Sequence, residues 1–236
     1  MRNRWFLIAL TVLAVVALAV GAGLFGIYHA AQEVPDFYAE AVAMAETYAD
    51  RNSDDFTDRA LALAGDVKKE GDWSSVFTDE QINGWLAVDL VEKHPNLLPQ
   101  NFESPRVKIF DDHIRVGAKC LIGGVSTIAW MDLEGRMTVD HELAVRFREI
   151  RAGSVPLPLS TIIDALTKAA EKFEVPLRWT TEDGDPIAII GLPTPEKKGQ
   201  RYELQRFTLT AGKMFLAGRT IKVDAKAAPP KVAIKP

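Results

Sequence analysis

Hydrophobic residues near the start of the chain form one uninterrupted block, from Trp5 to Tyr28, that contains no charged residue. A helix of this length crosses a hydrocarbon core of roughly 30 Å. Aromatic side chains at both ends favour the two membrane–water interfaces, and Arg2 and Arg4 favour the cytoplasmic side. The pattern predicts a cytoplasmic stub over residues 1–4, a single-pass transmembrane helix over 5–28, and an extracytoplasmic remainder held at the cell membrane.

A cleaved signal peptide is the alternative interpretation of this block. Its apolar region usually has about 7–15 residues and is followed by a cleavage site with small residues. The block here is longer, and the sequence Tyr28-His29-Ala30-Ala31 places large side chains where small ones are required. We therefore expect an anchor that is not cleaved.

After the block, apolar residues recur at helical spacing, and a polar stretch over 51–55 is predicted to separate two helices. Thr78 and Gln81 have the spacing of a capping box, which predicts the start of a third helix. Pro95 is expected to end that helix, because a proline disfavours helical geometry in the residue before it. The sequence therefore predicts a helical segment over residues 33–95.

The period of the pattern changes from 3.6 to two near residue 101, which indicates strands. One strand has a predicted buried face made of Ile114, Val116, Ala118, Cys120 and Ile122. Its other face, with His113, Arg115, Gly117 and Lys119, is predicted to face water. Val145 and Phe147 form the next inward face, and Ile150 falls out of phase with them. That change of phase predicts a bulge near Glu149.

An amphipathic helix is predicted over Leu159–Phe173, with one continuous apolar stripe. Two hairpins are predicted after it, over 177–192 and 201–224. The fold class is therefore α+β: a transmembrane helix, a helical segment, and a curved antiparallel sheet packed on an amphipathic helix over 101–224. The tail, 225–236, consists mostly of Ala, Lys and Pro and is predicted to be disordered.

Charge and cysteine content narrow the function classes. Residues 33–92 carry 15 acidic and 4 basic side chains, whereas the chain from residue 93 onward carries 22 basic and 17 acidic ones. This distribution lacks the basic stripe of a nucleic-acid-binding protein, so no nucleic-acid partner is predicted. Cys120 is the only cysteine, which excludes an intrachain disulfide and predicts a buried structural thiol.

Two predicted turns place a histidine beside carboxylates, Asp111-Asp112-His113 and Asp140-His141-Glu142. Such groups suit a metal site or an unrecognised hydrolase, but Asp also favours turns through its own backbone hydrogen bonds. No nucleophile elbow, zinc-protease motif or P-loop is present. The sequence therefore predicts no catalytic residue, no metal site, no cofactor and no enzyme activity.

Three arginines, Arg146, Arg148 and Arg151, follow one predicted strand, and at least two of them share its wet face. Two interpretations are open. The arginines contact phosphate head groups of the membrane, or they form a solvated face that discourages edge pairing.

Three features follow one another in an order that is similar to the YpmS-like family of membrane-anchored envelope proteins. They are the apolar block, the helix start FTDEQINGWL (Phe77–Leu86), and RAGSVPLPLSTIIDAL (Arg151–Leu166), which comes after long strands. The resemblance implies an anchored envelope protein and assigns no chemistry, so it implies no catalytic residue.

An apolar sheet face opposite an apolar helix stripe favours an anchored module that binds a lipid or another apolar ligand. The predicted ligand-lining residues are Ile114, Val116, Ala118, Val145, Phe147, Leu159, Ile162, Ile163, Leu166, Ala169, Ala170 and Phe173. The alternative is an anchored scaffold whose core is closed and whose acidic helices recruit an envelope protein partner.

Overall fold

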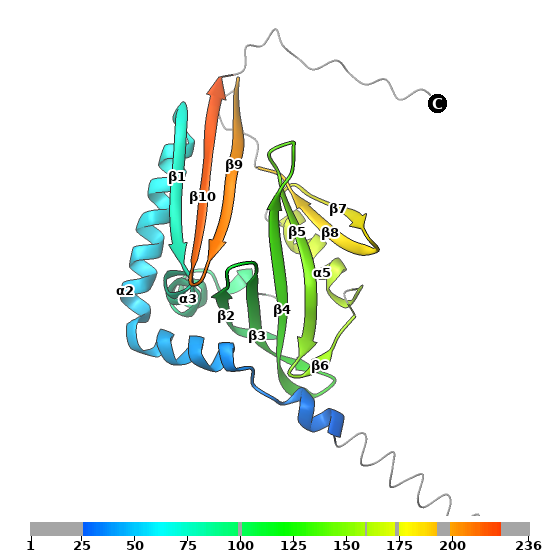
Figure 1. Ribbon diagram of the computed structural model, residues 1–236. Coiled ribbons are helices and arrows are strands. Elements are labelled where there is room, and N and C mark those ends of the chain that lie inside the picture. Colours follow the sequence, from blue (N-terminus) through cyan, green and yellow to red (C-terminus); the bar gives the residue numbers. More distant parts are fainter. Residues whose placement is uncertain (1–25, 99–100, 159, 173–174, 193–198, 223–236) are drawn as a thin grey trace, which may run out of the picture.

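The computed structural model describes residues 26–98, 101–158, 160–172, 175–192 and 199–222 (Figure 1). Residues 26–31 are helical. The helices that follow are α2 (Asp36–Val67), α3 (Asp79–Ala87), α4 (Asp89–Glu92), a 3₁₀ turn (Pro95–Leu97) and α5 (Ser160–Lys172). The strands are β1 (Gly71–Thr78), β2 (Phe102–Ile109), β3 (Ile114–Ile122), β4 (Val125–Met137), β5 (Leu143–Ala152), β6 (Val155–Pro156), β7 (Leu177–Glu182), β8 (Asp185–Ile190), β9 (Gln200–Thr210) and β10 (Lys213–Lys222).

The fold is α+β, with curved antiparallel sheets and a few helices, as the sequence predicts. The strands form two sheets where a single sheet was expected. A seven-stranded sheet has the order β2-β3-β4-β5-β8-β7, with β6 paired to β5, and a three-stranded sheet has the order β1-β10-β9. Figure 1 shows the two sheets side by side, with α2 along the outer side of the smaller one.

Two predicted segments lie largely outside the described residues. Of the predicted span over 5–28, only residues 26–28 are described, and the tail 225–236 is not. Within the described ranges, no helix is both long enough and apolar enough to cross a membrane.

The predicted helical segment over 33–95 contains a strand, which corrects that prediction. Residues Gly71–Thr78 pair with β10 along their whole length, from Gly71 opposite Thr220 to Thr78 opposite Lys213. Trp73 and Phe77 are buried on one face of β1, with Ser75 between them. The buried residues of β1 have a period of two, but the strand that pairs with β1 lies far along the chain. The short pattern alone therefore did not identify β1 as a strand.

The helical break lies at Tyr48 rather than in the polar stretch 51–55, which is helical. Tyr48 has φ −138° and ψ 22°, and α2 changes direction there (Figure 1). Ser53 is buried and donates a hydrogen bond of 2.9 Å to Oδ2 of Asp89 in α4. The polar residues of this stretch therefore join two helices.

Other local predictions are confirmed. Thr78 caps α3 in a capping box with Gln81, in which each side chain accepts a hydrogen bond from the other residue's backbone N–H. In the β4–β5 pair, Phe147 lies opposite Leu133 and Ile150 lies opposite Met131. Two residues of β5 therefore face one residue of β4, which is the bulge expected near Glu149.

Candidate functional site

One face of the seven-stranded sheet is apolar, and we call it the apolar face. Strand register places five of the predicted ligand-lining residues on it, because Ile114 pairs with Leu133 and Leu133 pairs with Phe147. The face consists of Ile114, Val116, Ala118, Cys120, Ala129, Met131, Leu133, Val145, Phe147, Ile150, Trp179 and Ala188. The sequence therefore identified the members of this face on β3 and β5.

Helix α5 lies over the apolar face at β7. Trp179 of β7 donates a hydrogen bond of 2.9 Å from Nε1 to Oγ1 of Thr167 in α5. The Trp179 ring also lies 5.7 Å from the ring of Phe147. Trp179 and Thr167 were not among the predicted site residues. The spacing of two between Leu177 and Trp179 in a predicted strand, which puts both on one face, was the signal available for Trp179.

We call the predicted lining residues of α5 and of the apolar face the apolar layer, and their side chains are only partly enclosed. Among the predicted lining residues, Val145 is buried, and Ile114, Val116, Ala118, Phe147, Ile163, Leu166 and Ala170 are half-buried. Leu159 and Phe173 lie outside the described residues, as do the side chains of Ile162 and Ala169. The described part of this layer is therefore apolar and accessible to solvent.

The apolar face is shielded from solvent at Gly135 and at Cys120. Phe207 of β9 packs against Gly135, where a Cβ atom would lie 2.5 Å from the Phe207 ring. Cys120 is 5% exposed, as predicted, and its burial raises the pKa of its thiol. Ile122, the last member of the predicted buried face, is exposed because it lies at the tip of the β3–β4 hairpin.

The opposite face of β3 is not fully wet, which corrects a second prediction. Gly117 is buried beneath Phe37 of α2, and a Cβ at Gly117 would lie 2.8 Å from Cζ of that ring. The Arg115 guanidinium lies over the rings of Trp130 and Phe37, with its carbon 4.3 Å and 5.6 Å from their centroids. Asp132 accepts two hydrogen bonds from Arg115, of 2.6 and 2.7 Å.

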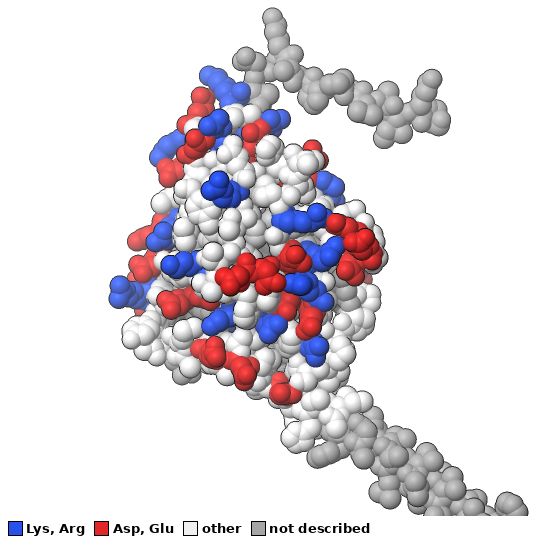
Figure 2. All heavy atoms as spheres, viewed as in Figure 1, with Lys and Arg blue, Asp and Glu red and all other residues white. Residues whose placement is uncertain are grey.

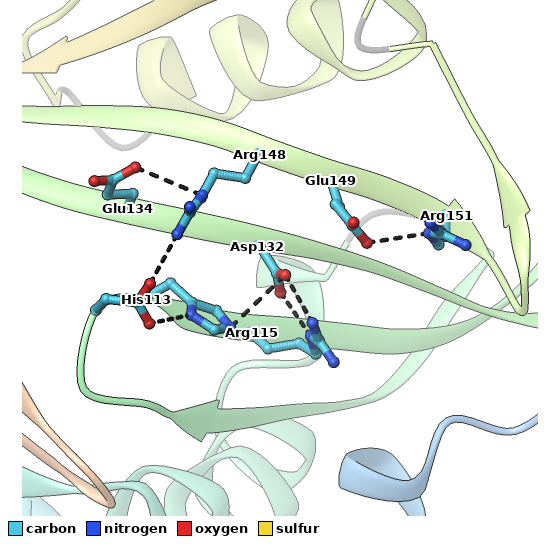
Figure 3. A network of polar contacts seen from close by, with 8 residues as sticks. His113, Arg115, Asp132, Glu134, Arg148, Glu149 and Arg151 are labelled. Atoms are coloured by element: carbon cyan, nitrogen blue, oxygen red, sulfur yellow. Dashed lines mark hydrogen bonds and ion pairs between the residues drawn. The ribbon is translucent and has the colours of Figure 1, made fainter.

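Beyond α2, this same face carries rows of arginines and carboxylates, and we call it the charged face. Figure 2 shows blue and red side chains alternating across it. In Figure 3, Arg148 lies between the carboxylates of Asp112, at 2.8 Å, and Glu134, at 3.7 Å. His113 and Arg148 both donate to Asp112 and hold the pKa of that carboxyl below its ordinary value.

Each of the three arginines of β5 forms an ion pair with a carboxylate of this chain. Arg146 lies 3.9–4.0 Å from Glu182 and Asp183, and Arg151 lies 3.1 Å from Glu149. A solvated strand face, one of the two interpretations open for these arginines, fits this pairing better than binding of phosphate head groups.

The charged face also covers a buried apolar cluster, Ala144, Ile187 and Ile189. Strand register places Arg146 opposite Ile187 and Arg178 opposite Ile189. Long arginine stems can lie along apolar side chains while their charged ends stay in water. Arg146 and Arg178 therefore lie beside this cluster, where their stems can cover it.

The Asp111-Asp112-His113 turn of the larger sheet is hydrogen-bonded to the smaller sheet. Asp111 accepts a hydrogen bond of 2.8 Å from the backbone of Ala211, in the β9–β10 turn. The His113 ring stacks on Phe110, with centroids 4.4 Å apart, and its Nδ1 lies 2.7 Å from Asp112.

The Asp140-His141-Glu142 turn has different neighbours. His141 contacts the carbonyl of Leu204 at 3.2 Å, and Glu142 pairs with Arg178. Within the part of the chain that the structure describes, no group of three or more His, Cys, Asp or Glu residues is arranged to hold a metal ion. Among the contacts described for the two turns, no neighbour is shared.

Comparison with known proteins adds no family to this geometry: no family model and no curated protein matches the chain.

Proposed function

We propose that this chain is a membrane-anchored extracytoplasmic domain that binds an apolar ligand, such as a lipid acyl chain, between α5 and the apolar face. The observation that carries the proposal is the partial exposure of the hydrophobic side chains in this layer. Ligand sites are lined mostly by apolar side chains with few polar groups, which matches the composition of the layer.

The geometry of α5 supports the same proposal. Its described contacts with the sheet include the hydrogen bond from Trp179 to Thr167. Leu166 and Ile163 remain half-buried although they belong to the apolar stripe of the helix. An acyl chain in this layer would remove these side chains and Phe147 from water together, at about 25 cal/mol for each Å² buried.

A second candidate is an anchored scaffold that recruits an envelope protein through α2. The observation that favours it is a run of exposed acidic side chains after the kink, at Asp50, Asp54, Asp55 and Asp58. In this case the layer under α5 is closed in solution and holds no ligand.

A large residue placed in the layer separates the two candidates. Ala170→Phe fills a ligand site but overpacks a closed core, which typically costs about 1–3 kcal/mol. We expect wild-type protein extracted in detergent to carry a lipid that mass spectrometry detects. We expect Ala170→Phe to lose that lipid while its melting temperature without ligand is unchanged or raised.

Ala64→Phe is the matched control, because Ala64 is exposed on α2 and far from the layer in the fold. It should retain the lipid and melt like wild type. Wild-type protein without lipid, together with a clearly lower melting temperature for Ala170→Phe, would reject ligand binding in favour of the scaffold.

A further inference from the structure

Exposed hydrophobic side chains gather at one end of the molecule. Leu121 and Ile122, at the tip of the β3–β4 hairpin, are 59% and 42% exposed. Ile27, Tyr28 and Val34, in and after helix 26–31, are 57%, 48% and 52% exposed. Single exposed hydrophobic residues are ordinary, but a group in one place marks a contact surface.

The hairpin tip is built as a narrow apolar point. Ile122 pairs with Val125 across Gly123 and Gly124, whose φ values are 57° and 83°. Glycine adopts positive φ at both central positions of a tight hairpin turn without steric cost. The turn therefore adds no polar side chain to the apolar tip.

Helix 26–31 is fixed beside this hairpin. Thr127, two residues into β4 from its start, donates a hydrogen bond to the carbonyl of Ala31. The backbone N–H of Ser154 donates to the carbonyl of Ala30 at 2.9 Å. In Figure 1 this helix lies at the end of the sheet near β6. The hairpin tip and the end of the predicted span over 5–28 therefore belong to the same end of the domain.

We propose that the hairpin tip, Leu121–Val125, inserts into the interface of the bilayer that holds the predicted span. The proposal rests on the anchoring part of the proposed function and does not depend on a ligand under α5. The occupant is a lipid surface, because the chain enters the domain from the predicted membrane helix at this end. An apolar tip lowers its free energy by leaving water for the boundary between head groups and acyl chains.

Side chains next to the tip fit the same placement. A cavity of about 440 Å³ lies beside the hairpin, lined by Gln32, Val34, Lys119, Ser126, Thr127 and Ile128. Its lining combines apolar groups with amide, hydroxyl and ammonium groups. A polar layer above an apolar tip matches the order of head groups above acyl chains.

Fluorescence of a single label tests the placement in the full chain. Cys120→Ala removes the native thiol, and a cysteine at Ile122 or Val139 then carries a nitrobenzoxadiazole dye. Val139 is 94% exposed in the β4–β5 turn, at the other end of β4, so it serves as the distant control. Each protein is reconstituted into phosphatidylcholine–phosphatidylglycerol vesicles, with and without lipids that carry a doxyl quencher on the acyl chain.

We expect the label at Ile122 to shift its emission to the blue and to lose emission to the doxyl lipid, while the label at Val139 does neither. Leu121→Asp should reduce both effects at Ile122, because a charge at the tip favours water. Leu61→Asp, a matched change of an exposed leucine on α2, should leave them unchanged.

Three outcomes would overturn the proposal. An unquenched label at Ile122 in membrane-inserted protein rejects tip insertion alone and leaves the anchor intact. A blue-shifted but unquenched label indicates contact with a second copy of the chain instead of lipid. Protein that alkaline carbonate releases from the vesicles is not inserted, and this outcome rejects the anchor and the tip together.

Discussion

At the scale of single residues, Asn83 substitutes for a neighbouring strand. Its side-chain amide donates to the carbonyl of Val107 and accepts from the N–H of the same residue, both at 2.8 Å. The side chain is 2% exposed, so water cannot replace either hydrogen bond. Asn83 thereby satisfies the backbone N–H and the carbonyl of Val107 in β2, where α3 packs against that strand.

Asn83→Asp is predicted to destabilise the fold, although the two side chains have nearly the same shape. The carboxylate cannot donate to Val107, and a buried carbonyl without a partner costs about 1–3 kcal/mol. Burial of the new charge adds to this cost. Denaturant unfolding should therefore show a clearly lower midpoint than wild type.

Asn101→Asp is the control for this change. Asn101 is exposed and has φ 80°, a conformation that Asp also tolerates. Equal midpoints for the two variants would show that the Asn83 hydrogen bonds are not important for stability.

Features of single residues were predicted correctly where the interacting residues lie within a few positions of one another in the chain. The capping box at Thr78 and the change of phase at Ile150 were both predicted correctly. The burial of Gly117 was not, because Phe37 reaches it from a helix about 80 residues earlier in the chain. A glycine between Arg115 and Ala118 is the one local signal of that close approach.

At the scale of elements, Asp89 joins α4 to α2. It accepts hydrogen bonds from Ser53, at 2.9 Å, and Thr57, at 3.0 Å, and pairs with Lys93. The hydrogen bond from Lys93 is the largest cause that holds the pKa of Asp89 below its ordinary value, against the opposing effect of burial.

This lowered pKa predicts how stability depends on pH. A carboxyl with a lowered folded-state pKa contributes stability that is present above its unfolded value of about 3.9. The contribution is lost as pH falls through the folded pKa. Asp89→Asn should therefore be less stable than wild type at pH 7, and the difference in unfolding free energy should shrink below about pH 4.

Asp66→Asn serves as the control, because Asp66 makes an exposed pair with Lys69. Exposed pairs contribute little to stability, so this variant should follow wild type across the same pH range. An Asp89→Asn difference that stays constant from pH 7 to pH 3 would contradict the assigned role of Asp89.

Helices and hairpins that depend on neighbouring residues were predicted from the sequence, whereas a strand that depends on a distant partner was not. Helix α5 and the β9–β10 hairpin follow from periodicity and a Gly turn. Strand β1 was missed because its partner, β10, lies about 140 residues later. The members of the apolar face on β3 and β5 were predicted, but how far their side chains are enclosed depends on packing that no spacing reveals.

At the scale of the whole molecule, the predicted anchor sets the orientation of the domain. With Arg2 and Arg4 in the cytoplasm, the chain after Tyr28 is expected outside. A reporter that is active only outside the cytoplasm should therefore work when fused after Pro236 and fail when fused before Arg2.

Replacing Arg2 and Arg4 with Glu should weaken this orientation and lower the activity of the C-terminal reporter, with replacement of Arg201 and Arg219 as the charge-matched control. Both control arginines are exposed and far along the chain, so they should not affect insertion. An inactive C-terminal reporter in the wild-type protein would refute the predicted topology.

The contact between helix 26–31 and the sheet determines how far this domain can reach. A flexible tether lets a domain explore a distance of about 5–6 Å times the square root of its length in residues. Here only residues 32–35 separate that helix from α2, and Ala30 and Ala31 are hydrogen-bonded to the sheet. In the anchored arrangement that we propose, the domain stands at a fixed height and moves over the membrane as one body. Its encounters are then confined to two dimensions, with molecules that lie in the same bilayer or are carried to its surface.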